Sequence, residues 1–158
     1  MTSTSSHPLK DQSALRWAFL EDMPDGCVVV SDRMEFVYAN AVARQLVGGD
    51  WFGKRCFEVM PTTDKTCAFH CETMRAVSES PEIVYCEESV DAGTDTARVF
   101  GVGLIPLGTK SVDHGKAVFV LRRKPVLGNP ATFKAQLLQD AEQVRRRIDT
   151  TLAATRPR

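Results

Sequence analysis

The chain has 158 residues, which is enough for one domain with a hydrophobic core and an additional terminal segment. Its 20 basic and 20 acidic side chains cancel, so no net charge attracts it to nucleic acid or to a membrane surface. No run of about 18 apolar residues is present, and residues 1–12 lack the apolar core of a signal peptide. We therefore expect a cytoplasmic protein without membrane spans.

The N-terminal part predicts a disordered segment and then a short helix. Residues 1–11 are rich in Ser and Thr, a composition typical of a disordered lead-in. Residues 12–22 predict an amphipathic helix, because apolar side chains recur there at helical spacing. These side chains, with one just beyond the helix, are Leu15, Ala18, Phe19 and Met23. The run at residues 24–26, Pro-Asp-Gly, ends the helix and forms a turn.

A β-hairpin and a second helix are expected next. The apolar run at residues 27–30 predicts a buried strand, and residues 35–38 predict its partner. Asn40 is a typical N-cap for the helix that follows, which two glycines at residues 48–49 end. We interpret Cys27 as a small buried hydrophobic side chain, because it lies in the apolar strand.

Three more strands are expected after a central helical segment. That segment covers residues 72–80 and ends near Pro81. Apolar and alternating runs predict strands at residues 83–88, 97–106 and 116–122. Residues 125–130, rich in Pro and Gly, then mark a linker. The order helix, two strands, helices, three strands predicts an α+β domain with one five-stranded sheet.

Cysteines are concentrated in residues 53–71. This stretch contains Cys56, Cys67 and Cys71, and a turn-forming run at residues 61–65 separates the first from the other two. Because Cys67 and Cys71 are four residues apart, a helix would place both sulfurs on one face. Three thiols around a turn suit a soft metal ion, an iron–sulfur cluster or a redox pair. Cys86 is either a fourth ligand or an alternating residue of its strand.

Several sequence pieces occur in the order of one known family. They are Asp25-Gly26 before the first strand, ANAVARQLVG at residues 39–48, and Gly53-Lys54 before the cysteines. Together with the order of elements, they make residues 12–124 resemble a PAS domain, the small sensor module of bacterial signalling proteins. The resemblance implies an antiparallel sheet whose helical side forms a ligand pocket. Haem, flavin, a fatty acid or a small aromatic molecule would suit such a pocket.

The cysteine stretch is also similar to a subset of PAS domains with the pattern GKxCYE…PCxxCP. In this chain Thr66 stands in place of the proline, and three residues rather than two separate Cys67 from Cys71. The similarity implies an iron–sulfur cluster or another metal at these cysteines. Haem and flavin are less favoured as cofactors. For flavin the reason is that Phe-Glu-Val-Met follows Cys56, where light-sensing relatives have Arg-Phe-Leu-Gln.

Residues 131–154 contain no Gly or Pro and predict one long helix. Its apolar residues are spaced close to a heptad repeat: Phe133, Leu137, Ala141, Val144, Ile148 and Leu152. Because nothing else in the chain is obviously placed to cover this seam, we expect it to pair with its twin in a homodimer. The competing interpretation is that the helix folds back on its own sheet. We interpret the arginines at residues 145–147 as a solvated helix face.

No hydrolase, metalloprotease or phosphate-binding motif is present, so we predict a protein that is not an enzyme. We predict a sensory module that binds a small ligand or cofactor and signals through its C-terminal helix to a downstream effector. Clustered cysteines add redox sensing to this hypothesis. The alternative is an iron–sulfur or metal-binding redox protein. The predicted boundaries are residues 1–11 for the lead-in, 12–124 for the sensor, 125–130 for the linker and 131–154 for the signalling and dimerisation helix.

Overall fold

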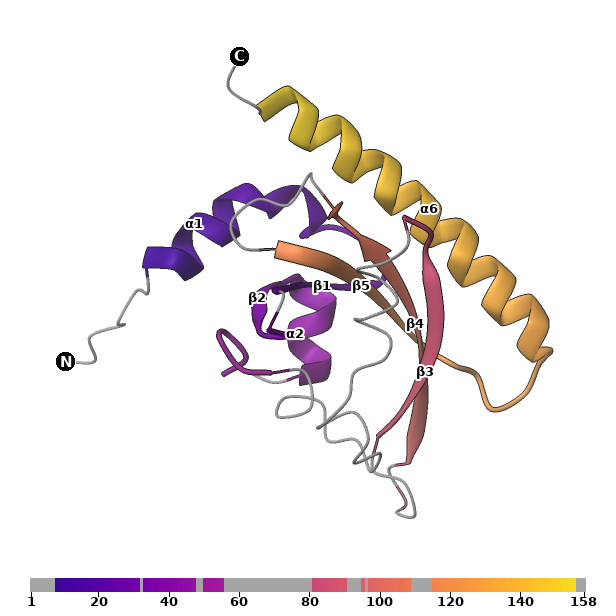
Figure 1. The fold of residues 1–158 in the computed structure, drawn as a ribbon. Helices are drawn as coiled ribbons and strands as arrows, with labels where there is room; N and C mark the ends of the chain where they lie inside the picture. Colours follow the sequence, from indigo (N-terminus) through magenta and orange to yellow (C-terminus); the bar gives the residue numbers. More distant parts are fainter. Residues whose placement is uncertain are drawn as a thin grey trace.

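The computed structural model describes residues 8–31, 33–47, 50–55, 81–90, 95, 97–108 and 115–155. Its helices are α1 (Pro8–Arg16), a 3-10 helix η1 (Ala18–Leu20), α2 (Ala41–Val47) and α6 (Pro130–Thr155). Its strands are β1 (Gly26–Ser31), β2 (Phe36–Ala39), β3 (Val84–Val90), β4 (Arg98–Pro106) and β5 (Gly115–Arg123). Figure 1 shows one sheet with α6 lying across one face and α2 on the other. None of the described helices is long and apolar enough to cross a membrane.

The five strands form one antiparallel sheet in the order β2-β1-β5-β4-β3. β5 therefore lies at the centre, with Val118 opposite Val29 of β1 and Val120 opposite Gly103 of β4. The strand runs that the sequence predicted all occur, with ends that differ by one or two residues. The predicted α+β class with a five-stranded antiparallel sheet is confirmed.

Two hydrophobic clusters occupy the two faces of the sheet. The α2-side cluster consists of Val28, Val30, Phe36, Ala39, Ala43, Trp51, Phe100, Val102, Leu104, Ala117, Phe119 and Leu121. The α6-side cluster consists of Trp17, Leu20, Cys27, Val29, Tyr38, Ile105, Leu107, Val118, Val120, Leu137, Ala141, Val144, Ile148 and Leu152. Successive residues of β1 and β5 alternate between the clusters because strand side chains point to opposite faces. The burial of all of β1 follows from this arrangement.

Helix α6 is seated on the sheet over two glycines of β4. A Cβ atom at Gly101 would lie 2.5 Å from Phe133 Cε2, and one at Gly103 would lie 3.1 Å from Ala141 Cβ. Larger residues would hold the helix away, so these glycines allow close contact. The helix begins at an N-cap, where Asn129 Oδ1 accepts a hydrogen bond of 2.9 Å from the Ala131 amide.

The apolar seam of α6 is covered by the chain's own sheet. Leu137, Ala141, Ile148 and Leu152 are at most 2% exposed in the single chain, and Val144 is 8% exposed. The expectation that nothing within the chain covers this seam is therefore wrong, because the glycines of β4 make room for the helix. The competing interpretation, a helix folded back on its own sheet, describes the structure. A homodimer stays a prediction, but it does not need this seam.

The N-terminal helix differs from its prediction in position and in buried face. α1 begins at Pro8, within the expected lead-in, and ends at Arg16, where the 3-10 helix follows after one residue. Leu15 is 82% exposed, whereas Trp17 and Leu20 are fully buried. The predicted apolar face is correct only in part: Phe19 and Met23 pack against the α6-side cluster, whereas Leu15 does not. The change from α-helix to 3-10 helix breaks the 3.6-residue spacing on which the prediction depended.

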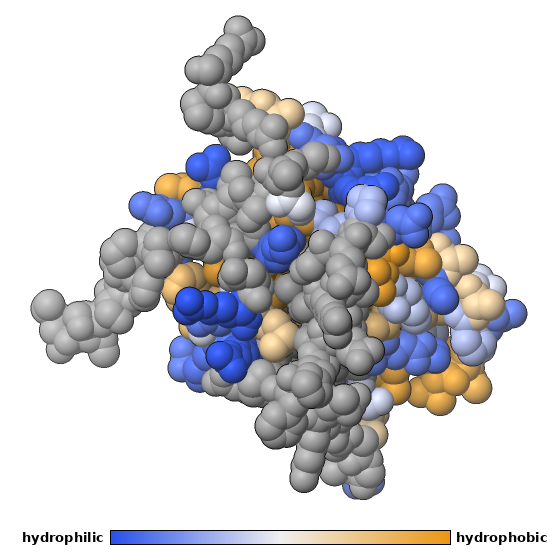
Figure 2. All heavy atoms as spheres, in the orientation of Figure 1, coloured by the Kyte–Doolittle hydropathy of each residue, from blue (hydrophilic) through white to orange (hydrophobic). Residues whose placement is uncertain are grey.

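The surface near the start of α6 carries exposed hydrophobic residues. Val126 and Leu127, in the connection between β5 and α6, are 95% and 86% exposed. Figure 2 shows orange, hydrophobic surface at the lower right of the view, where Figure 1 places this connection. Elsewhere on the coloured part of this face, hydrophilic and hydrophobic residues are mixed.

Candidate functional site

Asn40 organises the junction between the N-terminal segment and the sheet. Its buried side-chain oxygen accepts hydrogen bonds from the amides of Cys27, at 2.9 Å, and Ala43, at 3.0 Å. Its side-chain nitrogen donates to the carbonyl oxygens of Leu20, at 2.9 Å, and Asp25, at 3.0 Å. All four hydrogen-bonding positions of the amide are thus occupied. The predicted N-cap is confirmed, and the same side chain also fixes β1 and the turn before it.

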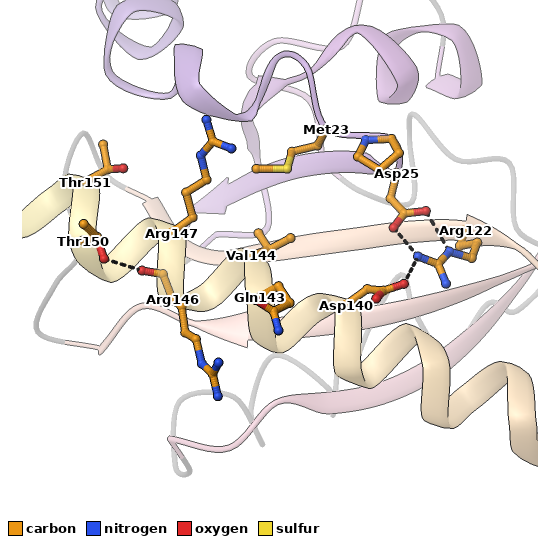
Figure 3. A pocket seen from close by; sticks show the side chains of 11 residues that line it. Met23, Asp25, Arg122, Asp140, Gln143, Val144, Arg146, Arg147, Thr150 and Thr151 are labelled. Carbon is orange, nitrogen blue, oxygen red and sulfur yellow. Dashed lines mark hydrogen bonds and ion pairs between the residues drawn. The ribbon is translucent and has the colours of Figure 1, made fainter.

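Arg122 joins three elements at one end of the α6-side face. From β5 it donates two hydrogen bonds to the Asp25 carboxylate, one of them from Nε to Oδ1 at 2.8 Å. Its Nη2 also donates to Asp140 Oδ2 of α6 at 2.6 Å. These hydrogen bonds raise the pKa of Arg122 above its ordinary value. The guanidinium therefore ties the turn before β1, the centre of the sheet and the C-terminal helix together (Figure 3).

The roles of Arg122 and Asp140 are not predicted from the sequence. Arg122 lies 97 residues from Asp25 and 18 from Asp140, so no local spacing links the three side chains. The available signal is the strand alternation: Leu121 faces the α2-side cluster, so its neighbour Arg122 faces α6.

The α2-side cluster lies on the face of the sheet where the resemblance to PAS domains predicts a ligand pocket. Aromatic side chains from three strands and from the segment after α2 meet there: Phe36, Trp51, Phe100 and Phe119. Trp51 is 5% exposed, and Phe52 contacts it edge-on with ring centroids 6.0 Å apart. Both side chains therefore pack against the core of this face. An apolar face of this kind offers a floor for a hydrophobic ligand.

Three of the four predicted metal-ligating cysteines, Cys56, Cys67 and Cys71, lie outside the described residues. Cys86 is partly buried in β3 and packs against the α2-side cluster with Val84. Its neighbours Ile83 and Tyr85 pack on the other face, as strand alternation requires. Within the described part of the chain, no group of three His, Cys, Asp or Glu residues is placed to hold a metal ion.

Cys27 is fully buried in β1, which confirms its interpretation as a small hydrophobic side chain. Burial raises the pKa of its thiol to about 12, and the negative charge of Asp25 adds to the shift. Because the reactive form of a cysteine is the thiolate, this thiol is unreactive near neutral pH. Cys27 is therefore a structural residue.

Residues 20–123, well over half of the chain, match the family described as the PAS fold. Comparison with curated proteins gives no match. The matched residues include Asn40, Asp25 and Arg122 and end at the last residue of β5.

Several solved structures have the same fold. The Vibrio cholerae VqmA–ligand–DNA complex has a TM-score of 0.53 at 20% identity, covering 69% of this chain and 50% of that chain. The Rhodobacter sphaeroides LOV protein has a TM-score of 0.53 at 13% identity, covering 76% and 70%. The phage VqmA–DPO complex has a TM-score of 0.52 at 19% identity, covering 92% and 62%. At these identities the likeness shows the fold alone, and this chain spans half the length of Vibrio cholerae VqmA.

Proposed function

This chain belongs to the PAS family, whose domains are typically non-catalytic sensory modules, and we propose that it signals through its own sheet. In this proposal, a small ligand binds on the α2 side of the sheet. The change that it causes passes between the strands to α6 on the opposite face. A downstream effector domain or protein then reads the position or order of α6.

The observation that carries the proposal is that the same strand contributes residues to both clusters. In β5, Phe119 and Leu121 belong to the α2-side cluster, while Val118 and Val120 belong to the α6-side cluster. Leu121 also directly precedes Arg122, which holds Asp140 of α6. Because core packing is close and stiff, a displacement of Leu121 on one face moves a contact of α6 on the other.

The structural neighbours support the ligand part of the proposal. Both VqmA structures are complexes with a ligand, named DPO in the phage protein. The aromatic α2-side cluster offers an apolar floor for a comparable small molecule. The DNA of the Vibrio cholerae complex has no counterpart in this proposal, because the chain spans only half of that protein.

The test uses Nile red, a neutral apolar dye, together with hydrogen exchange. We expect saturable binding with increased fluorescence, and a change in the amide exchange of α6 when the dye is bound. Phe119→Ala should alter the dye affinity, whereas the adjacent Val120→Ala should not, because its side chain faces α6. Absence of binding, or binding that leaves the exchange of α6 unchanged, would contradict the proposal.

The cysteines suggest a more specific form of the same function. Cys86 lies on the proposed ligand side of the sheet, which favours a role together with Cys56, Cys67 and Cys71. In this form they hold an iron–sulfur cluster or another metal, or form a redox pair. Protein purified without oxygen should then show a visible absorbance band with bound iron or zinc, or gain a disulfide on oxidation.

Cys27 in β1 provides the control for the cysteine proposal. Cys86→Ser should weaken or abolish the signal, whereas Cys27→Ser should leave it in place, because Cys27 faces the α6-side cluster. Colourless protein that contains no metal and gains no disulfide would contradict this form and leave ligand sensing alone.

Homodimerisation remains part of the proposal. With the α6 seam covered, another surface must form the contact, and the exposed pair Val126 and Leu127 is one source of apolar area. Sedimentation of the wild type against the double variant Val126→Ser/Leu127→Ser tests this. A monomeric wild type would contradict the dimer.

A further inference from the structure

A cavity of about 730 Å³ lies between α6 and the turn before β1, on the face opposite the proposed ligand site. Its lining includes Met23, Asp25, Arg122, Val144 and Arg147 (Figure 3). Pockets of this volume hold drug-sized ligands. All of its lining residues lie in the described part of the chain.

One end of the cavity is closed by paired charges. Asp25 and Asp140 both accept hydrogen bonds from Arg122, and Asp140 Oδ1 also accepts one of 3.1 Å from Gln136. Because these charged groups already pair with one another, they have little capacity to bind a further ion. They form one end of the cavity. The structure therefore assigns them to the wall.

The other end carries positive charge that the described residues leave uncompensated. Arg145 forms an ion pair with Glu142 and donates a hydrogen bond to the Pro81 carbonyl oxygen. Its charge is therefore compensated. No carboxylate of the described residues pairs with Arg146 or Arg147, although both line the cavity. Figure 3 shows the Arg147 side chain extending toward the side where Met23 lies, whereas Arg146 extends away from it. Arg147 is therefore the cation at this end whose side chain points toward Met23.

Between the two ends much of the wall is apolar, although Gln143 also lines it. Met23 and Pro24 supply it from the turn, and Val144, which is 8% exposed, supplies it from α6. A guanidinium prefers carboxylate or phosphate groups, which it binds with two parallel hydrogen bonds. A ligand that fits both features has an anionic group at one end and an apolar body.

We propose that this cavity binds a small organic anion, with its carboxylate or phosphate on Arg147 and its apolar body against Met23 and Val144. The site is separate from the ligand site proposed on the α2 side of the sheet, and it does not depend on that proposal. A molecule bound here contacts α6 and the turn before β1 together, so it would hold the C-terminal helix on the sheet.

The experiment is an NMR titration with three probes of similar shape: benzoate, phenyl phosphate and neutral benzamide. At about 10 mM, above the ~1 mM Kd of a weak fragment, we expect at least one anion to shift the amide signals of Met23 and of residues 143–151. Benzamide should leave them in place. The anion that binds identifies the preferred group, and binding of either one supports the site.

Matched variants test the residue assignment. Arg147→Gln should weaken anion binding about tenfold or more, the effect of losing a charge-assisted hydrogen bond. Arg33→Gln, at an exposed arginine in the β1–β2 turn, should not change it. Thr151→Trp should also reduce binding by filling the cavity. No shift with either anion, an equal shift with benzamide, or full affinity in Arg147→Gln would overturn the proposal, provided that the variant keeps its native spectrum.

Discussion

The two faces of the sheet are closed in different ways. The α6-side face is covered largely by one continuous helix of 26 residues, far in sequence from most of the strands on which it packs. On the α2-side face, the described cover comes from the seven-residue α2, which directly follows the β1–β2 hairpin, and from Trp51 and Phe52 shortly after α2. A single long helix loses its contacts as a unit, whereas short local segments adjust separately. The difference teaches that α6 is part of the folded core, so a signal read at α6 must change core packing.

The strongest way to break this comparison is to remove α6 from the core. Leu137→Asp places a carboxylate at a fully buried position, and we expect a loss of at least about 4 kcal/mol in unfolding free energy. Gln139→Asp, at an exposed position of the same helix, should change stability by less than about 0.5 kcal/mol. Urea unfolding measures both. Equal stability of the two variants would mean that the seam is not part of the monomer's core.

The Asn40 junction sharpens the comparison, because Asn40 forms hydrogen bonds with residues of both clusters. Asn40→Ala leaves buried groups of Cys27, Leu20 and Asp25 without their hydrogen-bond partner, so we expect a loss of about 2–4 kcal/mol. Asn129→Ala removes only the exposed N-cap of α6 and should cost about 1 kcal/mol. Thermal and urea unfolding of the two variants provide the measurement, and similar losses would refute the special role of Asn40.

Close contact between α6 and β4 gives a smaller effect. Gly101→Ala brings a methyl group against the Phe133 ring, and we expect a loss of about 1–3 kcal/mol together with faster amide exchange in the first turns of α6. Truncating the ring removes most of the clash. The double variant Gly101→Ala/Phe133→Ala should therefore lose less than the sum of the two single variants, and strict additivity would contradict the contact.

The smallest effect depends on pH and belongs to the α6-side cluster alone. The folded pKa of Cys27, about 12, lies above its ordinary value of 9.0, so the unfolded chain loses this proton first as pH rises. The wild type should therefore lose stability relative to Cys27→Ala above about pH 9, by at most about 1.4 kcal/mol per pH unit. Unfolding curves from pH 8 to pH 10, over which the loss stays below about 1.4 kcal/mol, provide the measurement. A constant difference between the two proteins would show that the thiol titrates normally.

The sequence predicted the strands and α2 because their signals are local. The apolar run of β1, the N-cap at Asn40 and the glycines that follow α2 each act within a few residues. The α1 region was predicted less well, because its change to a 3-10 helix after Arg16 has no clear local signal. Trp17 and Leu20, rather than Leu15, therefore became the buried residues.

The contacts of α6 could not be predicted in the same way. Its apolar spacing suits a twin helix and the chain's own sheet equally well, so periodicity alone cannot choose between them. Gly101 and Gly103 decide in favour of the sheet, but their role is visible only when β4 and α6 are placed together. Likewise, Arg122 gained its partners from segments 97 and 18 residues away.

The central position of β5 has a consequence for synthesis on the ribosome. β5 is the common neighbour of β1 and β4, so the two hairpins of the sheet cannot join until residues 115–123 have been made. At ~5–20 residues per second, the β1–β2 hairpin waits on the order of ten seconds for this partner. During that interval the apolar edge of β1 is available to chaperones or to other nascent chains. Meanwhile the Asn40 junction, whose partners all lie within 20 residues of it, can already hold the hairpin and α2 together.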